Sequence, residues 1–470
     1  MKIELPPFIL QILKKFQDSG YEIYIVGGAV RDILTKRPVD DWDFTTDATP
    51  PEILKIFPDG FYDNVFGTVG ISHESSPNPY EITTFRREFD YSDHRRPTKV
   101  EWGKTLEDDL QRRDFTINAM ALAIEQESKR VKEWKNKTST LPLSRSFTLI
   151  DRYDGQNDLE NKLIRAVGDP NKRFREDALR MMRAVRIAAE LGFTIEDKTF
   201  EAIKNNSGLI NKIAKERVKD ELLKIIASHN PYEGVVIFRN SGLMEEIIPE
   251  MEAAFGVEQK SPGRHHIYDV GTHSLLSLKN VAEKNNDAIV RLATLIHDIG
   301  KPKTFKKQDN GVITFYNHEL VSGRIARDIA KRLRFSKKQA EKFYRLVRYH
   351  QFTVDEKQTD SSLRRFIRNV GLENVSDMID LRVGDRLGGG ARETSWRLEE
   401  FKKRLIEVQK QPFTVHDLKI TGHDVMRELG IKPGPIVGMV LNKIYDEVVE
   451  KKVENKKEDL IKLMKELTLN

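Results

Sequence analysis

The sequence predicts an α+β protein in which an N-terminal domain built on a mixed β-sheet is followed by all-helical domains. Short β-rich runs separated by turns fill the first 150 residues, whereas runs with helical periodicity dominate from about residue 155 onward. At 470 residues the chain is too long for a single hydrophobic core. Its composition, 39% hydrophobic and 32% charged, is typical of a globular protein.

The expected elements follow in chain order. A leading helix is predicted near residues 6–18, and the β-rich runs after it are Glu22–Val26, Asp41–Thr46, Val69–Ser72 and Tyr80–Phe85. The later helical runs include Asp177–Leu191, Arg217–Ala227, Ala288–His297 and Ala340–Tyr349. A change of pattern near residue 150 and turn-rich segments at Gln259–Gly263 and Gly388–Gly390 predict four parts, at 1–150, 151–258, 259–390 and 391–470, of which the last is helical and lysine-rich.

Composition excludes several kinds of chemistry. The chain has no cysteine, which rules out disulfides and thiolate nucleophiles, so any metal must be held by His, Asp or Glu. There is no apolar stretch long enough to span a bilayer and no apolar signal-peptide core, so we expect a cytoplasmic protein without a membrane partner. The net charge of +6 fits a polyanionic partner, although many soluble proteins share such a balance.

Between Val26 and Phe44 the chain is expected to form a strand, a glycine turn, a short helix and a second strand. Alternation along that second strand places Asp41 and Asp43 on one face and Trp42 and Phe44 in the core, while Asp40 falls on the opposite face from the two aspartates. Two adjacent carboxylates are costly unless a divalent cation neutralises them. A glycine turn at a helix N-terminus favours phosphate. The pattern therefore predicts a nucleotide–metal site of the two-metal phosphoryl-transfer type.

The stretch GGAVRDILTKRPVDDWDFTTDATP carries a family resemblance. It resembles the nucleotidyltransferase superfamily that includes DNA polymerase β, and it looks most like class II tRNA nucleotidyltransferases and bacterial poly(A) polymerases. The resemblance implies a head domain in which Asp41 and Asp43 share two Mg²⁺ ions with the incoming triphosphate, next to an RNA 3′-hydroxyl. Glu81, in the run Tyr80–Phe85, is the candidate third carboxylate. The nucleotide-binding residues that the same motif implies are Gly27, Gly28 and Arg31.

Two further segments of the head fit this resemblance. Arg86–Pro97 is charged, aromatic and turn-rich, so we expect a mobile loop; in the family a loop here helps the site switch from C to A addition, and members that add only the two Cs tend to lack it. Gln111–Ala119 (QRRDFTINA) matches the family's second motif, which handles ribose and triphosphate. In that motif Asp114 and Asn118 can hydrogen-bond the ribose hydroxyls, and Arg112 and Arg113 can pair with phosphate oxygens.

The segment Phe174–Arg180 (FREDALR) is expected to lie on one helix. On a helix Asp177 and Arg180 are three residues apart and share a face, so a carboxylate lies beside a guanidinium. This pair could accept from the exocyclic amine and donate to the ring nitrogen that cytosine and adenine have in common. The pattern resembles the family's nucleotide-selecting motif, in which we expect Glu176 to hold Arg180 in place. Ile213–Glu221 resembles the motif that closes this neck, and Glu216 and Arg217 are expected to be structural.

Six of the eleven histidines fall between residues 265 and 350. With two aspartates they form an H…HD…H…H…D order that resembles the HD phosphohydrolase superfamily. His273, His297, Asp298 and Asp385 suffice for one metal, and His318 and His350 could support a second metal or bind phosphate. Imidazoles with carboxylates suit transition metals such as Mn, Ni, Co or Fe. The resemblance implies hydrolysis of 2′,3′-cyclic and 2′-phosphates, and hence RNA repair; the alternative is a metal-binding domain that mainly supports the RNA.

Together these patterns predict an enzyme that adds CCA to tRNA 3′ ends from CTP and ATP without a nucleic-acid template, with an appended HD hydrolase and a tail that contacts tRNA. A poly(A) polymerase is a rival because its head and neck look alike, although an HD cluster is unexpected there. A-only addition is a second rival. The rival of another class is an HD metal phosphohydrolase with a non-catalytic, RNA-binding head. The oligomeric state stays open.

Overall fold

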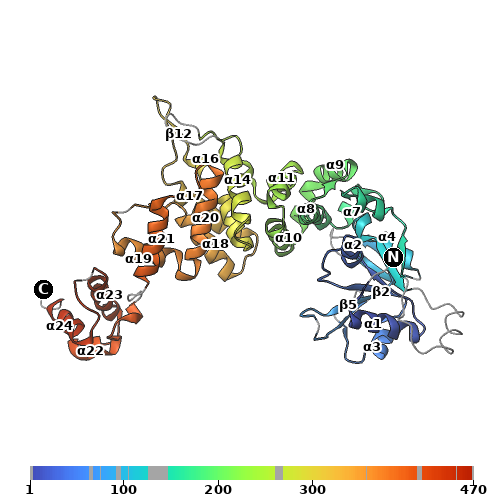
Figure 1. Ribbon diagram of the computed structural model, residues 1–470, viewed down its shortest axis with the longest axis horizontal. Helices are drawn as coiled ribbons and strands as arrows, with labels where there is room; N and C mark the ends of the chain where they lie inside the picture. The colour runs from blue at the N-terminus through green and yellow to red at the C-terminus, as the bar shows by residue number, and fades with distance from the viewer. Residues whose placement is uncertain are drawn as a thin grey trace. The chain divides into compact units, whose positions relative to one another are not determined.

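The computed structural model describes residues 4–62, 67–74, 76–91, 97–103, 105–124, 147–259, 268–355, 357–409, 415–450 and 452–467. The chain forms two compact units, residues 1–252 and 253–470 (Figure 1). The first unit contains a seven-stranded mixed sheet followed by helices, and the second is almost entirely helical. The α+β prediction is confirmed. The finer division into four parts stays a prediction.

The sheet of the first unit has the strand order β3-β4-β5-β2-β1-β8-β9. Strand β2 pairs in parallel with β5 and antiparallel with β1, so it lies near the middle of the sheet. Its Phe44 is buried on one face, aligned with the buried Ile82 of β5. The strands span Ile23–Val26 (β1), Asp43–Thr46 (β2), Phe61–Tyr62 (β3), Thr68–Ile71 (β4), Tyr80–Thr84 (β5), Met120–Ile124 (β8) and Phe147–Asp151 (β9).

The leading helix and the first strands lie close to their predicted positions. Helix α1 (Pro7–Asp18) buries Ile9, Ile12, Leu13 and Phe16, which recur at helical spacing along one face. Helix α2 (Gly28–Leu34) follows the glycine turn, and α3 (Pro50–Ile56) begins with a capping box formed by Thr49 and Glu52. Figure 1 shows α1 and α3 beside the sheet. Strand β2 starts only at Asp43, so the predicted strand beginning at Asp41 is too long by two residues.

The predicted loop at Arg86–Pro97 is wrong for most of its length. Residues Arg86–Tyr91 (β6) pair antiparallel with Pro97–Trp102 (β7), and residues 92–96 lie outside the described part of the chain. A two-stranded ribbon buries little surface, so its sequence need not show the apolar alternation that marks a sheet strand. The sequence analysis also missed β8 and β9, which add two strands to the sheet next to β1.

The first unit continues as helices with one small parallel strand pair, β10 (Leu163–Ile164) with β11 (Thr194–Ile195). The helices are α4 (Leu106–Gln111), α6 (Gly155–Glu160), α7 (Pro170–Glu176), α8 (Leu179–Leu191), α9 (Asp197–Asn206), α10 (Lys215–Ala227), α11 (Pro231–Asn240), α12 (Leu243–Ile247) and α13 (Pro249–Glu252), with 3₁₀ turns at Thr116–Asn118 and Ser207–Lys212. Helix α8 packs against α10 and α11 and buries Met181, Val185 and Ile187.

The single helix predicted across Phe174–Arg180 is wrong, because α7 ends at Glu176 and α8 begins at Leu179. Asp177 has extended backbone angles (φ −137°, ψ 105°), and its Oδ1 accepts a hydrogen bond from the Leu179 amide at 3.0 Å. Aspartate side chains compete in this way with intrahelical bonding, so they favour helix starts over helix interiors. Asp177 therefore lies in the break between the two helices, whereas Arg180 lies on α8.

In the second unit α14 packs against α15 and α20, and α15 packs against α18. Its helices are α14 (Val270–Ala282), α15 (Ala288–Ile296), α16 (Lys301–Thr304), α17 (His318–Arg332), α18 (Lys337–Tyr349), α19 (Asp360–Val370), α20 (Val375–Gly388), α21 (Trp396–Val408), α22 (Gly422–Leu429), α23 (Pro435–Val449) and α24 (Lys457–Leu467). A short hairpin pairs β12 (Lys306–Lys307) with β13 (Ile313–Thr314), and 3₁₀ turns lie at Leu372–Asn374 and Val415–Asp417. None of the helices in the described ranges is long and apolar enough to cross a membrane.

Candidate functional site

The first candidate site lies where β2 and β5 run side by side. Asp43 and Glu81 are register partners on these parallel strands, so their side chains project from the same face, opposite the buried Phe44 and Ile82. Asp41 is exposed and lies in the segment just before β2. Asp40 is also exposed and precedes β2.

Electrostatics link Asp41 to Asp43. Burial raises the pKa of the Asp43 carboxyl; the guanidinium of Arg113 opposes this rise, and the nearby negative charge of Asp41 adds to it. Holding both carboxylates ionised is therefore unfavourable without more positive charge. Asp41, Asp43 and Glu81 supply carboxylate oxygens, the ligand type that Mg²⁺ prefers, and Asp43 and Glu81 are register partners on adjacent strands.

Gly27 allows the backbone to approach this site closely. It has φ +73°, and a Cβ there would lie 3.0 Å from Nη1 of Arg113 and 3.2 Å from Oδ2 of Asp43. A side chain at this position would need both an unfavourable backbone conformation and movement of the two charged groups. The backbone geometry therefore favours glycine at this position of the predicted motif. Asp43 and Arg113 both lie next to Gly27.

The arginines of the second motif are held in place by a buried carboxylate. Asp109 is fully buried and accepts from Arg112 Nε at 2.8 Å and from Arg113 Nη2 at 2.9 Å. Burial favours the neutral form of Asp109, but the two guanidinium charges outweigh it and lower its pKa. The sequence analysis missed Asp109, although its spacing of three and four residues from the arginines was a usable signal.

Asp114 and Asn118 sit at the centre of a second network. Oδ1 of Asp114 accepts from the Phe115 amide at 2.9 Å and from Asn118 Nδ2 at 3.3 Å, and its Oδ2 accepts from Arg183 Nε at 2.7 Å. Burial alone would raise the pKa of Asp114, but the Arg183 charge holds it well below its usual range. Arg31 donates to Asn118 Oδ1 at 3.0 Å while it pairs with Asp32. The sequence analysis missed Arg183, which lies one helical turn after Arg180.

Asp177 and Arg180, the two residues expected to read the base, contact different partners. Glu176 accepts from Arg180 Nη1 at 2.8 Å, which is the predicted ion pair, and Arg180 Nη2 donates to the Arg112 carbonyl at 3.1 Å. Asp177 instead lies against Arg217, with Oδ2 3.5 Å from Nη2. Arg217, expected to be structural, therefore contacts a residue that we assigned to base reading.

The second candidate site gathers histidines and aspartates that lie on α14, α17 and α20 or directly follow α15 and α18. Oδ2 of Asp298 lies 3.2 Å from His297 Nε2 and 3.6 Å from His273 Nε2. Its Oδ1 lies 3.2 Å from His318 Nε2 and 3.5 Å from His350 Nε2. Asp385 Oδ1 lies 3.1 Å from His273 Nε2. All six predicted residues thus meet around Asp298, whereas His265 and His266 lie outside the described residues.

The imidazoles are oriented by backbone carbonyls. Nδ1 of His297 lies 2.7 Å from the Thr294 carbonyl, and Nδ1 of His350 lies 2.7 Å from the Val347 carbonyl; His318 makes the same contact with Phe315 at 2.9 Å. A carbonyl only accepts, so each Nδ1 donates a proton to its carbonyl, and Nε2 is the ring atom that faces Asp298. Ligand histidines in proteins are oriented in this way.

The charges of this cluster fit a cation. Burial lowers the pKa of His297, but Asp298 and Asp385 outweigh it and raise that pKa to about 10. The Asp298 carboxyl has a pKa well below its usual range, because His297 and Lys301 outweigh its burial. Two sets of three groups, each with ligand atoms within 4.8 Å of one another, share Asp298: His273, His297 and Asp298, and Asp298, His318 and His350. This donor set fits one or two transition-metal ions.

Lys301 is a further member that the sequence analysis missed. Its Nζ lies 2.6 Å from Asp298 Oδ2, and the residue is buried. Its position in the sequence was a usable signal, because a lysine three residues after Asp298 lies on the same side of a helical turn. Lys301 and His318 also line a pocket of about 410 Å³ together with the exposed Tyr316. A ligand in this pocket can therefore reach the cluster.

Comparisons with known proteins cover nearly the whole chain. Residues 23–165 match the family described as poly A polymerase head domain, 192–255 the probable RNA and SrmB-binding site of polymerase A, and 306–464 the putative tRNA nucleotidyltransferase domain 2. The CCA-adding enzyme of Ligilactobacillus salivarius is 33% identical over 459 residues, which cover 97% of this chain and 96% of that protein. The CCA-adding enzyme of Pediococcus pentosaceus is 32% identical over 458 residues, with the same coverage of both chains.

Solved structures agree. The crystal structure of the Bacillus stearothermophilus CCA-adding enzyme in complex with CTP has a TM-score of 0.69 and 27% identity, and it covers 99% of this chain and 98% of that one. Full-length similarity of this kind, together with the carboxylate site between β2 and β5, identifies the family. The chain belongs to the class II CCA-adding enzymes, the nucleotidyltransferases that add CCA to tRNA 3′ ends.

Proposed function

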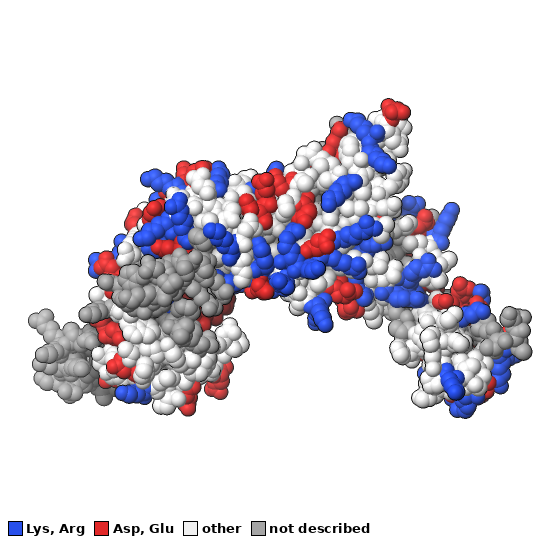
Figure 2. All heavy atoms as spheres, turned by 180° about the vertical axis from the view of Figure 1, so that it is seen from behind, with Lys and Arg blue, Asp and Glu red and all other residues white. Residues whose placement is uncertain are grey.

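We propose that the head adds CCA to tRNA from CTP and ATP, with Asp41, Asp43 and Glu81 holding two Mg²⁺ ions. The observation that carries this proposal is the register of Asp43 with Glu81 on adjacent parallel strands, with the charge of Asp41 close by. The CTP complex of the Bacillus stearothermophilus relative supports the same nucleotide here. Figure 2 shows many Lys and Arg side chains among acidic ones on one face, which suits contact with an RNA backbone.

The ions, when bound, would activate the RNA 3′-hydroxyl and offset charge on the leaving pyrophosphate. The protein's own contribution is positioning. Asp109 holds Arg112 and Arg113 in fixed orientations, so they can meet triphosphate oxygens with little rearrangement. Arg31 donates to the oxygen of the Asn118 side-chain amide, and Asp114 accepts from its nitrogen. These two bonds fix the orientation in which the amide can meet a ribose hydroxyl.

For base selection we propose Asp177 and Arg180. The carboxylate accepts from the exocyclic amine of cytosine or adenine, and the guanidinium donates to the adjacent ring nitrogen. Guanine and uracil place a carbonyl oxygen opposite the carboxylate, which is repulsive. In the structure Asp177 lies 3.5 Å from Arg217, and Arg180 pairs with Glu176 at 2.8 Å.

For the cluster around Asp298 we propose metal-dependent hydrolysis of 2′,3′-cyclic or 2′-phosphates on RNA ends. Support comes from four imidazoles that present Nε2 to one carboxylate, and from the pocket lined by Lys301 and His318. Bound metal would polarise the phosphate and activate water. The buried ammonium of Lys301 is placed to offset the negative charge of a phosphate entering the pocket.

The addition reaction is tested with tRNA transcripts that end before CCA, after CC, or after CCA, supplied with CTP, ATP or both. We expect every transcript to grow only until it carries CCA. Processive adenylation of the complete transcript would identify a poly(A) polymerase instead. Addition of A only to transcripts ending in CC would identify an A-adding enzyme. Failure to extend any transcript would mean a non-catalytic head.

The hydrolytic reaction is tested by metal analysis and by turnover of a 2′,3′-cyclic nucleotide. We expect copurifying transition metal and measurable hydrolysis, both lost in Asp298→Asn. The control is Asp287→Asn, which makes the same charge change at the start of α15 and keeps a residue that caps helices well. Bound metal without hydrolysis of cyclic or 2′-phosphates would leave the cluster a structural site.

A further inference from the structure

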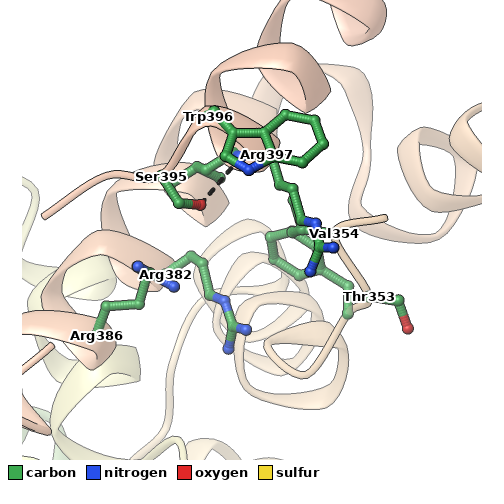
Figure 3. Close-up of a pocket in the computed structure, with 9 residues that line it drawn as sticks. Thr353, Val354, Arg382, Arg386, Ser395, Trp396 and Arg397 are labelled. Carbon is green, nitrogen blue, oxygen red and sulfur yellow. Dashed lines mark hydrogen bonds between the residues drawn. The ribbon is translucent and has the colours of Figure 1, made fainter. Parts of the chain in front are cut away.

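A separate pocket lies between the end of α20 and the start of α21, with a volume of about 490 Å³. Arg382 and Arg386 line it from α20, and Trp396 and Arg397 line it from α21 (Figure 3). The described residues that line it include three arginines and no carboxylate. The lining is thus rich in positive charge, with Arg382 paired to Asp385 outside the pocket, and its size suits a small organic ligand.

Two of its arginines, Arg382 and Arg386, each donate one hydrogen bond to a neighbouring group of the protein. The other N–H groups of each guanidinium can meet a ligand. Arg382 donates from Nη1 to Asp385 Oδ2 at 3.1 Å. Arg386 donates from Nε to the Arg392 carbonyl at 3.2 Å, and within the described part of the chain it forms no ion pair. Its charge is therefore available to a phosphate, for which a planar guanidinium is well suited. Figure 3 shows Arg382 and Arg397 extending toward the same space.

Trp396 supplies a flat apolar surface beside these charges. It is the first residue of α21 and is 64% exposed, which is unusual for so large an apolar side chain. The guanidinium carbon of Arg397 lies 5.3 Å from the indole centroid. Aromatic rings next to arginines are the common means by which proteins stack nucleobases without sequence preference.

We propose that this pocket binds one nucleotide unit, with its base stacked on Trp396 and its phosphate paired with Arg386 and Arg382. This site differs from the nucleotide site of the head. It shares no lining residue with the Asp298 cluster, although Arg382 contacts Asp385. The nucleotide can come from a free mononucleotide or from a single-stranded stretch of RNA, because both present a base joined to a phosphate.

The test is photo-crosslinking of the full-length protein with 5-iodouridine monophosphate and with a short single-stranded RNA that contains one 5-iodouridine. Tryptic peptides are then identified by mass spectrometry. We expect labelling of peptide 393–397, which contains Trp396, and at least tenfold weaker binding to this site in Trp396→Ala, as measured by competition. Arg386→Gln should weaken labelling of that peptide severalfold. The matched control Lys403→Gln removes a charge from the exposed part of α21 outside the pocket and should change nothing.

The two probes also distinguish a free mononucleotide from single-stranded RNA as the source of the bound nucleotide. Stronger labelling of peptide 393–397 by RNA at equal concentration would place the pocket on the path of an RNA strand, and stronger labelling by the monophosphate would make it a mononucleotide site. No labelling of this peptide by either probe would overturn the proposal, as would equal labelling in Arg386→Gln and the unmodified chain. Crosslinking of peptide 393–397 does not depend on tRNA extension or on hydrolysis. A protein that lacks both activities can therefore still be tested for nucleotide binding at this pocket.

Discussion

The carboxylate site of the head and the cluster around Asp298 both fit divalent cations, but they are built in opposite ways. The head offers only oxygen ligands, and Asp41 is exposed in a segment before its strand. The cluster buries its four histidines and fixes three of them by backbone carbonyls. Open carboxylate sites suit Mg²⁺ that arrives with substrate phosphates. Buried imidazole sites suit a resident transition metal.

The largest expected effect is a double dissociation between the two regions. Asp43→Asn removes one of the paired carboxylates, so tRNA extension should fall by about 10³-fold while hydrolysis of a cyclic phosphate persists. His297→Ala should have the reverse effect. Gel analysis of extended tRNA and phosphate release measure the two activities. A folded single variant that loses both would contradict the separation.

Metal removal is expected to separate the head site from the Asp298 cluster by the metal that each one needs. Treatment with a strong chelator should abolish both activities, and addition of Mg²⁺ alone should restore extension. Hydrolysis should stay about 10–100-fold low until Mn²⁺, Ni²⁺, Co²⁺ or Fe²⁺ is supplied, because imidazoles bind these ions better. Full recovery of hydrolysis with Mg²⁺ alone would show that the two sites do not differ in this way.

Within the head unit, Asp177→Ala should reduce discrimination against UTP and GTP by about tenfold, because one bidentate contact distinguishes bases by roughly 1–3 kcal/mol. Binding of the triphosphate should change less. Asp220→Ala is the control, since Asp220 is an exposed acid on α10. Unchanged selectivity in Asp177→Ala would leave base choice to other residues.

The smallest effect concerns the link between α8 and the second motif. Arg183→Gln should lower the free energy of unfolding at pH 7 by about 1.5 kcal/mol, because it removes a charged hydrogen bond to the buried Asp114. The pKa of Asp114 lies below its usual range when folded, so this stabilisation is fully present above about pH 4 and lost as the pH falls further. Urea titrations at several pH values measure it, with the exposed pair variant Lys204→Gln as control. A difference that grows below pH 4 would contradict this assignment.

Local patterns predicted much of the fold. Helical spacing predicted α1, the short apolar runs predicted β1 and β5, and the glycine pair predicted the turn before α2. Three features escaped prediction because they depend on local competition or weak burial: the hairpin β6–β7, the late start of β2 at Asp43, and the helix break at Asp177. At the helix break the Asp177 side chain accepts a hydrogen bond from the Leu179 amide, and hydrophobic periodicity carries no information about such a bond.

By itself, the sequence determined which residue types are present and in which order: paired aspartates after a glycine turn, a motif rich in arginines, and a histidine–aspartate series. Only the tertiary structure decided which of them meet. The register of Asp43 with Glu81, the hydrogen bond from Arg183 to Asp114, and the convergence on Asp298 of His318 and His350 all join residues whose placement depends on the packing of separate elements. Spacing along a chain defines one helix face or one strand face, but hydrophobic packing between elements sets the distances at which charged groups interact.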